Sequence, residues 1–127
     1  YLVPRVILFR EEHSRRVLVD KVDFVSAPGS SAPGVHRPGG PSALLTGLAL
    51  FGFDKLLQRF RLESVHPGHT LEEVLDNTGF AFERPAALAV TPGPDADELA
   101  LLSGRIRGEL AETYPRFAAG VLGSSAA

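Results

Sequence analysis

Runs and alternations of apolar residues along the chain predict a series of short strands. Residues 6–9 form a continuous apolar run, which is typical of a strand covered on both faces. Residues 47–53 form a second such run, and residues 57–65 alternate between polar and apolar side chains. With a turn between them, these two segments predict an antiparallel hairpin. A weaker alternation predicts a further strand at residues 21–25.

The stretch from residue 64 to residue 80 predicts a strand end, a turn, a capped helix and the start of another extended segment. Thr70 is a suitable N-cap, and Glu73 is placed so that its carboxylate can reach back to the N-cap amide. Gly79 suits a left-handed residue that closes the helix. Residues 80–82 then predict a short strand, and residues 84–94 an extended crossing. Upstream, residues 42–46 suit one turn of helix.

The pattern near the end of the chain predicts a last helix. Asp95 is its expected N-cap, with Glu98 in the reciprocal position. Gly104 and Gly108 indicate either close packing against another element or simply a weak helix. Pro115 is expected to end the helix, and residues 118–127 are expected to form a disordered tail. The apolar stripe of this helix is Leu99, Leu102, Ile106 and Leu110.

A long loop rich in glycine and proline occupies residues 27–41. Loops of this length without secondary structure are usually functional or disordered, and glycine permits close approach of the backbone to a ligand. A phosphate-binding P-loop is excluded because no Gly-Lys-Ser/Thr follows. A mobile surface loop and a binding loop both remain open interpretations.

Composition narrows the class of protein. The formal net charge of −2 gives no argument for a nucleic-acid surface. The chain has no cysteine, which excludes disulfides and thiolate chemistry, and it has no apolar run long enough to span a membrane. We expect a cytoplasmic protein. Because the chain contains no methionine and starts abruptly with a strand, we expect it to be part of a longer polypeptide.

The residues alone define no self-contained active site. Four histidines are present, but their spacing is not of the zinc-binding type, so we expect no metal site. No Gly-x-Ser-x-Gly elbow supports a serine nucleophile. The pair Glu11-Glu12 lies among arginines and is interpreted as a solvated turn rather than a catalytic acid.

Several motifs in order nevertheless resemble one family. They are Glu-His-Ser at 12–14, Lys-Val-Asp-Phe-Val-Ser-Ala-Pro-Gly at 21–29, Gly-Gly-Pro-Ser-Ala-Leu-Leu-Thr at 39–46, Leu-Ala-Leu-Phe-Gly-Phe-Asp at 48–54 and the stretch 64–80. Together they resemble the C-terminal half of the β subunit of the family I coenzyme A transferases, of the glutaconate and 3-oxoacid type. The segment Glu-Leu-Ala-Leu-Leu at 98–102 resembles that family's terminal helix.

The resemblance implies an α/β fold, an open mixed sheet with flanking helices of the CoA-transferase (NagB/RpiA-like) type. Residues 1–117 would be the C-terminal part of a β-subunit-like domain. Such enzymes move coenzyme A between carboxylic acids through a glutamyl-CoA intermediate, with no cofactor beyond coenzyme A as substrate. The family's nucleophile lies in a Glu-Asn-Gly type of motif, which this sequence lacks. No catalytic residue is therefore assigned here.

By the same resemblance, the chain would supply a wall of the site for coenzyme A and its acyl group. The expected wall residues are Gly39, Gly40, Pro41 and Ser42, with His13 as a further candidate. Alternatively, Gly39 and Gly40 only turn the chain into the next strand. The implied partners are an α subunit in a hetero-oligomer, acyl-CoA and carboxylate substrates, with no nucleic acid and no membrane. Two other functions stay open: a CoA-ester hydrolase β subunit of the ring-cleaving type, and a non-catalytic interaction domain.

Overall fold

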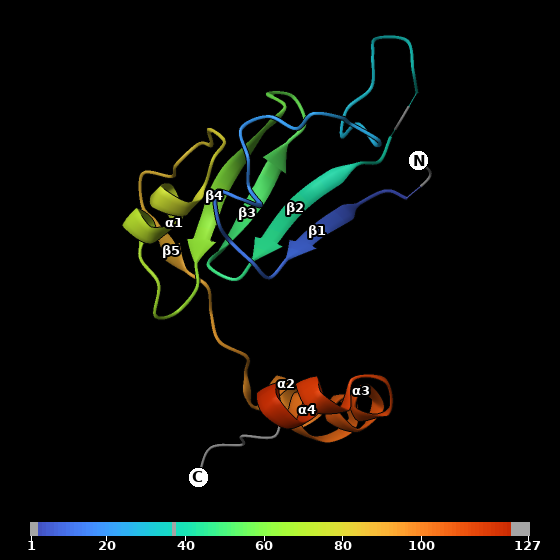
Figure 1. The fold of residues 1–127 in the computed structure, drawn as a ribbon, viewed down its shortest axis with the longest axis vertical. Helices are drawn as coiled ribbons and strands as arrows, with labels where there is room; N and C mark the ends of the chain where they lie inside the picture. The colour runs from blue at the N-terminus through green and yellow to red at the C-terminus, as the bar shows by residue number, and fades with distance from the viewer. Residues whose placement is uncertain (1–2, 37, 123–127) are drawn as a thin grey trace. The chain divides into compact units, whose positions relative to one another are not determined.

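The structure is a computed structural model that describes residues 3–36 and 38–122 (Figure 1). The chain divides into two compact units, residues 1–92 and residues 93–127. The first unit contains the sheet and one helix, and the second contains the remaining helices. Each unit is described by itself.

The first unit is built on one mixed, five-stranded sheet with strand order β1-β2-β3-β4-β5 (Figure 1). The β1–β2 and β4–β5 pairs are parallel, whereas β2–β3 and β3–β4 are antiparallel. This confirms the open mixed sheet expected from the sequence. The strands are β1 (Val6–Arg10), β2 (Pro41–Thr46), β3 (Ala49–Asp54), β4 (Arg59–Val65) and β5 (Ala89–Val90).

The β3–β4 hairpin follows the sequence pattern closely. Phe51 pairs with Leu62 and Phe53 with Phe60, so the apolar set of β4 lies on the same face as the large side chains of β3. The carboxylate of Asp54 accepts hydrogen bonds from the backbone amides of Leu56 and Leu57 in the turn, at 2.8 and 2.9 Å. The predicted hairpin and its turn are both confirmed.

The hydrophobic core lies on this face of the sheet. Phe51 is fully buried, and its ring lies 5.2 to 6.4 Å between centroids from three other phenylalanine rings. Helix α1 (Leu71–Asn77) contributes Val74, which is also fully buried. The segment after β1 contributes Leu18. The core residues are Leu18, Leu44, Ala49, Phe51, Leu62, Val65 and Val74.

Helix α1 has the predicted N-cap, but the Glu73 carboxylate binds the His69 ring instead of the N-cap amide, and the helix ends differently from the prediction. The side chain of Thr70 accepts a hydrogen bond from the backbone amide of Glu73 at 3.1 Å. The Glu73 carboxylate binds His69 Nδ1 at 3.0 Å. Gly79 does not adopt the expected left-handed conformation, since the C-cap is Thr78 with extended backbone. Glycine is required at 79 because a side chain would overlap the carbonyl oxygen of Leu18, which accepts the Gly79 amide at 2.6 Å.

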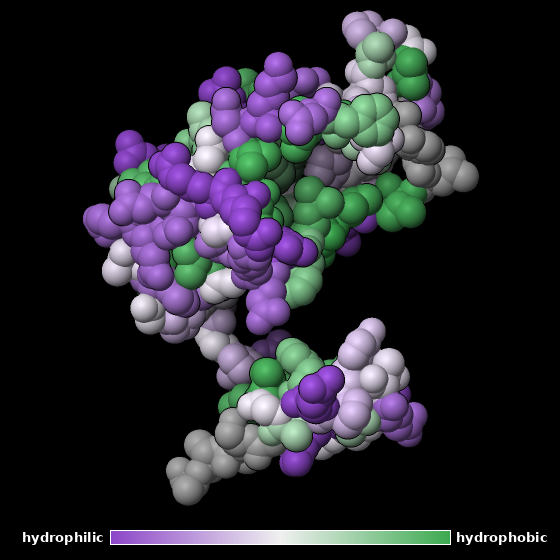
Figure 2. Space-filling view, viewed as in Figure 1, coloured by the Kyte–Doolittle hydropathy of each residue, from purple (hydrophilic) through white to green (hydrophobic). Residues whose placement is uncertain are grey.

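Strand β1 exists where expected, but the prediction that both its faces are covered is wrong for the described residues. Its central side chains, Ile7, Leu8 and Phe9, are 66%, 42% and 69% exposed. The strand lies at an edge of the sheet, where β2 is its only pairing partner in the described part of the chain. Figure 2 shows apolar surface gathered over the β1–β2 part of this unit. An apolar run thus gives a strand but does not by itself say what covers it.

Three other local predictions are corrected. Residues 42–46 belong to β2 instead of a helical turn, because Leu44 and Thr46 are buried in sheet positions between β1 and β3. Residues 21–25 form no strand and leave Phe24 81% exposed. Residues 80–82 form no strand either. Only Glu83 bridges to the sheet, through two backbone hydrogen bonds to β4, while the following crossing contains the unpredicted β5.

The second unit is helical. Helix α2 (Ala96–Leu101) starts with the predicted capping box of Asp95 and Glu98. It continues through a π-helical stretch η1 (Leu102–Ile106) into α3 (Arg107–Thr113). Beyond the helix's own backbone and chain neighbours, no atom of the described residues lies within 4 Å of a Cβ built at Gly104 or Gly108, so the described part of this unit shows no close packing at these glycines.

Pro115 follows the end of α3 and also occupies the first turn of α4 (Pro115–Val121). Helix α4 buries Ala118. Residues 118–121 are therefore helical where a disordered tail was expected, and residues 123–127 lie outside the described residues. Among the described helices, none combines the length and apolar character needed to cross a bilayer.

Candidate functional site

An apolar cleft lies beneath the glycine- and proline-rich loop of the first unit. Its volume is about 530 Å³. One wall is Val6 and Leu8 of β1, and another is Phe53 and Phe60 of the hairpin. The remaining wall is the loop itself, at residues 27–30 and 39–41. This space is called the apolar cleft below.

The structure brings three of the predicted wall residues, Gly39, Gly40 and Pro41, to this cleft. A side chain at Gly39 would overlap the carbonyl oxygen of Val3, and Gly40 has a φ of +132°, which disfavours any other residue. The Gly40 carbonyl accepts the Val6 amide at 2.9 Å and so fixes the loop to β1. The glycines thus turn the chain into β2 and at the same time present bare backbone to the cleft.

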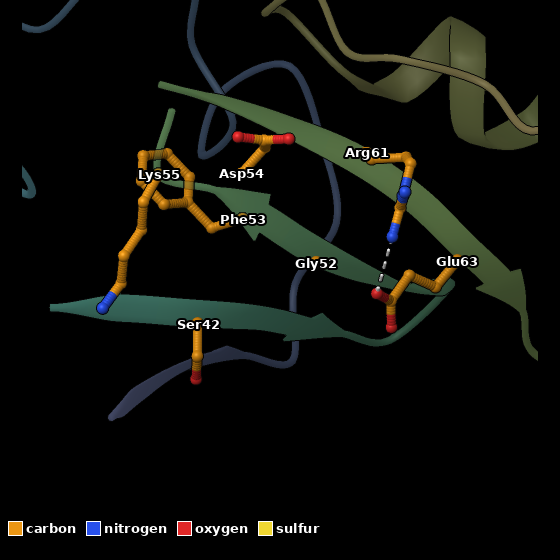
Figure 3. Close-up of a pocket in the computed structure, with 7 residues that line it drawn as sticks. All are labelled: Ser42, Gly52, Phe53, Asp54, Lys55, Arg61 and Glu63. Atoms are coloured by element: carbon orange, nitrogen blue, oxygen red, sulfur yellow. Dashed lines mark ion pairs between the residues drawn. The ribbon is translucent and has the colours of Figure 1, made fainter. Parts of the chain in front are cut away.

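Ser42 lies elsewhere, in a smaller polar pocket of about 250 Å³ (Figure 3). The β1–β2 register is irregular between Val6 and Ile7, where Val6 pairs with Pro41 but Ile7 pairs with Ala43. Such an irregularity re-aims a side chain, and the Ser42 hydroxyl donates to the Val6 carbonyl at 3.2 Å. The pocket is lined by Ser42, Gly52, Phe53, Asp54, Lys55, Arg61 and Glu63.

The charged groups of this polar pocket are held loosely. Arg61 and Glu63 form an exposed ion pair at 3.8 Å, while Lys55 lies at the other end of the pocket in Figure 3 and donates to the Pro38 carbonyl at 3.4 Å. Exposed pairs of this kind contribute little free energy. Gly52 leaves room for the Glu63 carboxylate, which would overlap a Cβ at that position. The charged side chains of this pocket are therefore not held firmly enough to orient a ligand.

His13 also lies away from the glycines, within a hydrogen-bond network at the other end of β2. Its Nδ1 lies 2.8 Å from the Thr46 hydroxyl and its Nε2 lies 2.9 Å from the Thr78 hydroxyl. Its ring is 6.1 Å from that of Phe51. Burial lowers the pKa of His13, although the Val74 backbone and the Glu73 charge act in the opposite direction. Both ring nitrogens already have partners, which suits a histidine that ties α1 to the sheet.

His66 and His69 have separate partners as well. His66 Nε2 donates to the Thr46 carbonyl at 2.9 Å, which leaves Nδ1 to accept from the Thr91 hydroxyl at 2.8 Å. Its partner Thr91 also lies 2.7 Å from the Ser64 hydroxyl. Among the described residues, no group of three or more acidic, histidine or cysteine side chains could hold a metal ion.

The carboxylates of the described residues do not supply a nucleophile to the apolar cleft. None of the described residues that line the cleft is charged. A hydrogen bond from Ser14 lowers the pKa of Glu12, and one from His69 lowers the pKa of Glu73. Glu12 also pairs with Arg16 at 2.6 Å. These acids are engaged in local structure, and the predicted absence of a catalytic glutamate from this region stays a prediction.

The sequence reasoning missed the other walls of the cleft: Val6, Leu8, Phe53, Gln58 and Phe60. The alternation of residues 57–65 predicted Gln58 and Phe60 on the same side of one strand, although the structure begins β4 at Arg59 and leaves Gln58 in the turn. It could not show that β1 and the loop close over them, because that depends on pairing between distant segments.

Comparisons with known proteins find similar β subunits. The β subunit of 3-oxoadipate CoA-transferase from Pseudomonas knackmussii is 34% identical over 103 residues, which are 76% of this chain and 39% of that protein. The β subunit of glutaconate CoA-transferase from Acidaminococcus fermentans is 30% identical over 75% of this chain and 38% of its own length. The IpdB subunit of the cholesterol ring-cleaving hydrolase from Rhodococcus jostii is 34% identical over 72% of this chain and 38% of its own length.

Solved structures of related proteins are similar to this chain as well. Rhodococcus jostii IpdAB matches with a TM-score of 0.71 and 32% identity, over 79% of this chain and 42% of that one. Glutaconate CoA-transferase from Acidaminococcus fermentans matches with a TM-score of 0.64 and 27% identity, over 77% of this chain and 40% of that one. The decarboxylase AibA/AibB matches with a TM-score of 0.57 and 32% identity, over 77% of this chain and 36% of that one. No protein-family model matches the chain. The chain thus spans about four-tenths of the curated relatives.

Proposed function

This chain is homologous to part of the β subunit of the family I CoA-transferases, and on that premise we propose that it belongs to a β subunit that moves coenzyme A between carboxylic acids. The reaction would pass through a glutamyl-CoA thioester, with the glutamate supplied from outside these residues. The homology carries the proposal, since two of the three curated relatives named above are transferase β subunits.

The apolar cleft supports this assignment. It presents the backbone of Gly39 and Gly40 beside an uncharged space, which suits a thioester more than a free acid. Because the described lining holds no carboxylate, a nucleophile would have to approach from another segment or subunit. The chain would then act as one wall of a shared site, with an α subunit as partner. Its relatives IpdAB and AibA/AibB are likewise named as two-component proteins.

A second function, CoA-ester hydrolysis, has specific support from the similarity to the IpdB hydrolase component and to the IpdAB structure. Transfer and CoA-ester hydrolysis would both start from attack on a thioester, whereas the reaction in the name of the IpdB relative cleaves a ring. Transfer and CoA-ester hydrolysis differ in the group that receives the acyl fragment or the coenzyme A afterwards. The acceptor therefore distinguishes them, and the fold does not.

The test uses the protein with its full polypeptide and whatever subunit co-purifies with it. Radiolabelled coenzyme A in an acyl-CoA donor is followed with and without an added carboxylate. Label that moves into a new acyl-CoA only when the carboxylate is present supports transfer, and release of free coenzyme A without an acceptor supports hydrolysis. Trapping of a protein-bound CoA thioester by borohydride would support the covalent route. Neither exchange nor release, with a panel of donors, would favour the non-catalytic interaction domain.

A further inference from the structure

The walls of the apolar cleft limit the kind of acyl group that it can receive. We propose that this cleft holds the acyl portion of the thioester and that this acyl portion is apolar, without a second carboxylate at its far end. The inference rests on the proposed function for the thioester itself. It adds the substrate class, which that proposal leaves open.

Size and wall chemistry carry the first step. A volume of about 530 Å³ falls within the range of sites for small molecules, which bury most of an apolar ligand. Val6 and Leu8 face the cleft from β1, and the rings of Phe53 and Phe60 lie edge to face at 5.1 Å. Each methylene that such walls remove from water raises a binding constant about fourfold.

The absence of charge among the described lining residues carries the second step. A carboxylate buried there would lose its hydration without gaining an arginine or lysine partner among the described lining residues. Lys55 and Arg61 line the polar pocket instead of the cleft. An acid-ended acyl group would therefore bind more weakly than an apolar one of the same length.

The polar groups of the cleft are few. The uncharged polar residues that line it are Ser30 and Gln58, beside the glycine residues of the loop. Gln58 occupies the left-handed position at the end of the hairpin turn, with a φ of 52°, where glycine or asparagine would be less strained. A glutamine at this lining position adds an uncharged amide to the residues around the cleft. Gly29 keeps the loop close, since a Cβ there would lie 3.2 Å from the Pro41 ring.

Two thioesters of equal acyl length test the proposal: S-hexanoyl-N-acetylcysteamine and S-adipoyl-N-acetylcysteamine, the second ending in a carboxylate. Binding to the chain is measured by NMR titration and calorimetry at neutral pH. We expect the hexanoyl thioester to bind at least about tenfold more tightly. Equal or tighter binding of the adipoyl thioester, or binding of neither, would overturn the inference.

Strand β1 offers a matched pair of variants, because Leu8 lines the cleft and its neighbour Ile7 points to the opposite face. Leu8→Asp should weaken hexanoyl binding about tenfold or more, while Ile7→Asp should leave it within about twofold. Should Leu8→Asp fail to fold, Leu8→Phe narrows the cleft with an apolar side chain and should also weaken binding. Equal effects at both positions would reject the cleft as the site.

These results separate the inference from the proposed function. A complete complex that exchanges coenzyme A only between acid-ended acyl groups would overturn the apolar assignment and leave transfer intact. Tight hexanoyl binding that is weakened by substitution of Leu8 but not of Ile7, in a complex with no exchange or hydrolysis, would support the apolar assignment and overturn the proposed function. The cleft would then be an apolar ligand site without the proposed chemistry.

Discussion

Replacement of His13 by alanine tests whether the hydrogen-bond network between β2 and α1 stabilises the fold. The variant loses two hydrogen bonds between the ring and the hydroxyls of Thr46 and Thr78, of which a neutral ring donates one and accepts the other, and it loses the packing of the ring beside Phe51. The threonines keep other partners, since Thr46 also bonds the Ala49 backbone and Thr78 the Val74 carbonyl. With no polar group orphaned, the two hydrogen bonds should account for about 2 kcal/mol of the cost, and the lost packing of the ring adds to it.

The pH dependence makes the test more specific. The pKa of His13 is lowered in the folded protein, so the unfolded chain binds the proton more readily. Stability from the neutral ring is therefore present above the unfolded pKa of about 6.5 and is lost as pH falls below it. Urea unfolding of the parent between about pH 7.5 and 5.5 should show this loss. The His13→Ala variant should lack this component of the loss.

His36→Ala is the control, because His36 lies exposed in the glycine-rich loop. It should reproduce both the stability and the pH profile of the parent. A His13-dependent stability that rises toward acid pH would refute the reasoning. It would mean that the two threonine oxygens and Glu73 stabilise the charged ring more than burial opposes it. An unchanged free energy of unfolding in His13→Ala would show that the network contributes nothing.

Substitutions at three further positions test local structure by thermal and urea unfolding. Thr70→Ala removes the α1 cap and should cost about 1 kcal/mol, while Thr70→Ser should restore most of it; equal stability of the two would reject the cap. Gly79→Ala should destabilise by about 1 to 3 kcal/mol because the new methyl group meets the Leu18 carbonyl, and a neutral result would contradict that contact. Gly108→Ala, in an open helical position, should instead stabilise by up to about 1 kcal/mol.

Local chemistry explains which parts of the fold the sequence could predict. Thr70, Asp95 and the alternation of β4 act through neighbours a few residues away, and the structure has all three as expected. Residues 42–46 failed because a short apolar run suits a helical turn or a strand equally well. Pairing with β1 and β3, which are distant in sequence, decides for the strand.

Gly79 shows the same limit for a single residue. Its position after a helix suggested a left-handed cap, which is the commonest local reason for glycine there. The actual reason is tertiary, because the backbone of Leu18 passes too close for a side chain. From the sequence alone, a glycine required for a left-handed backbone cannot be told from a glycine required by a close packing partner.

Tertiary structure also explains why the predicted wall residues lie at two different pockets. Gly39, Gly40, Pro41 and Ser42 are consecutive, so sequence reasoning treated them as one wall. The register irregularity between β1 and β2 leaves Pro41 at the apolar cleft but places Ser42 at the polar pocket. Alternate side chains of a strand serve opposite faces, and a bulge shifts which residues those are. A contiguous motif at the start of a strand should therefore be divided by face before its residues are assigned to one ligand, and here only the glycines and Pro41 remain candidates for the acyl thioester.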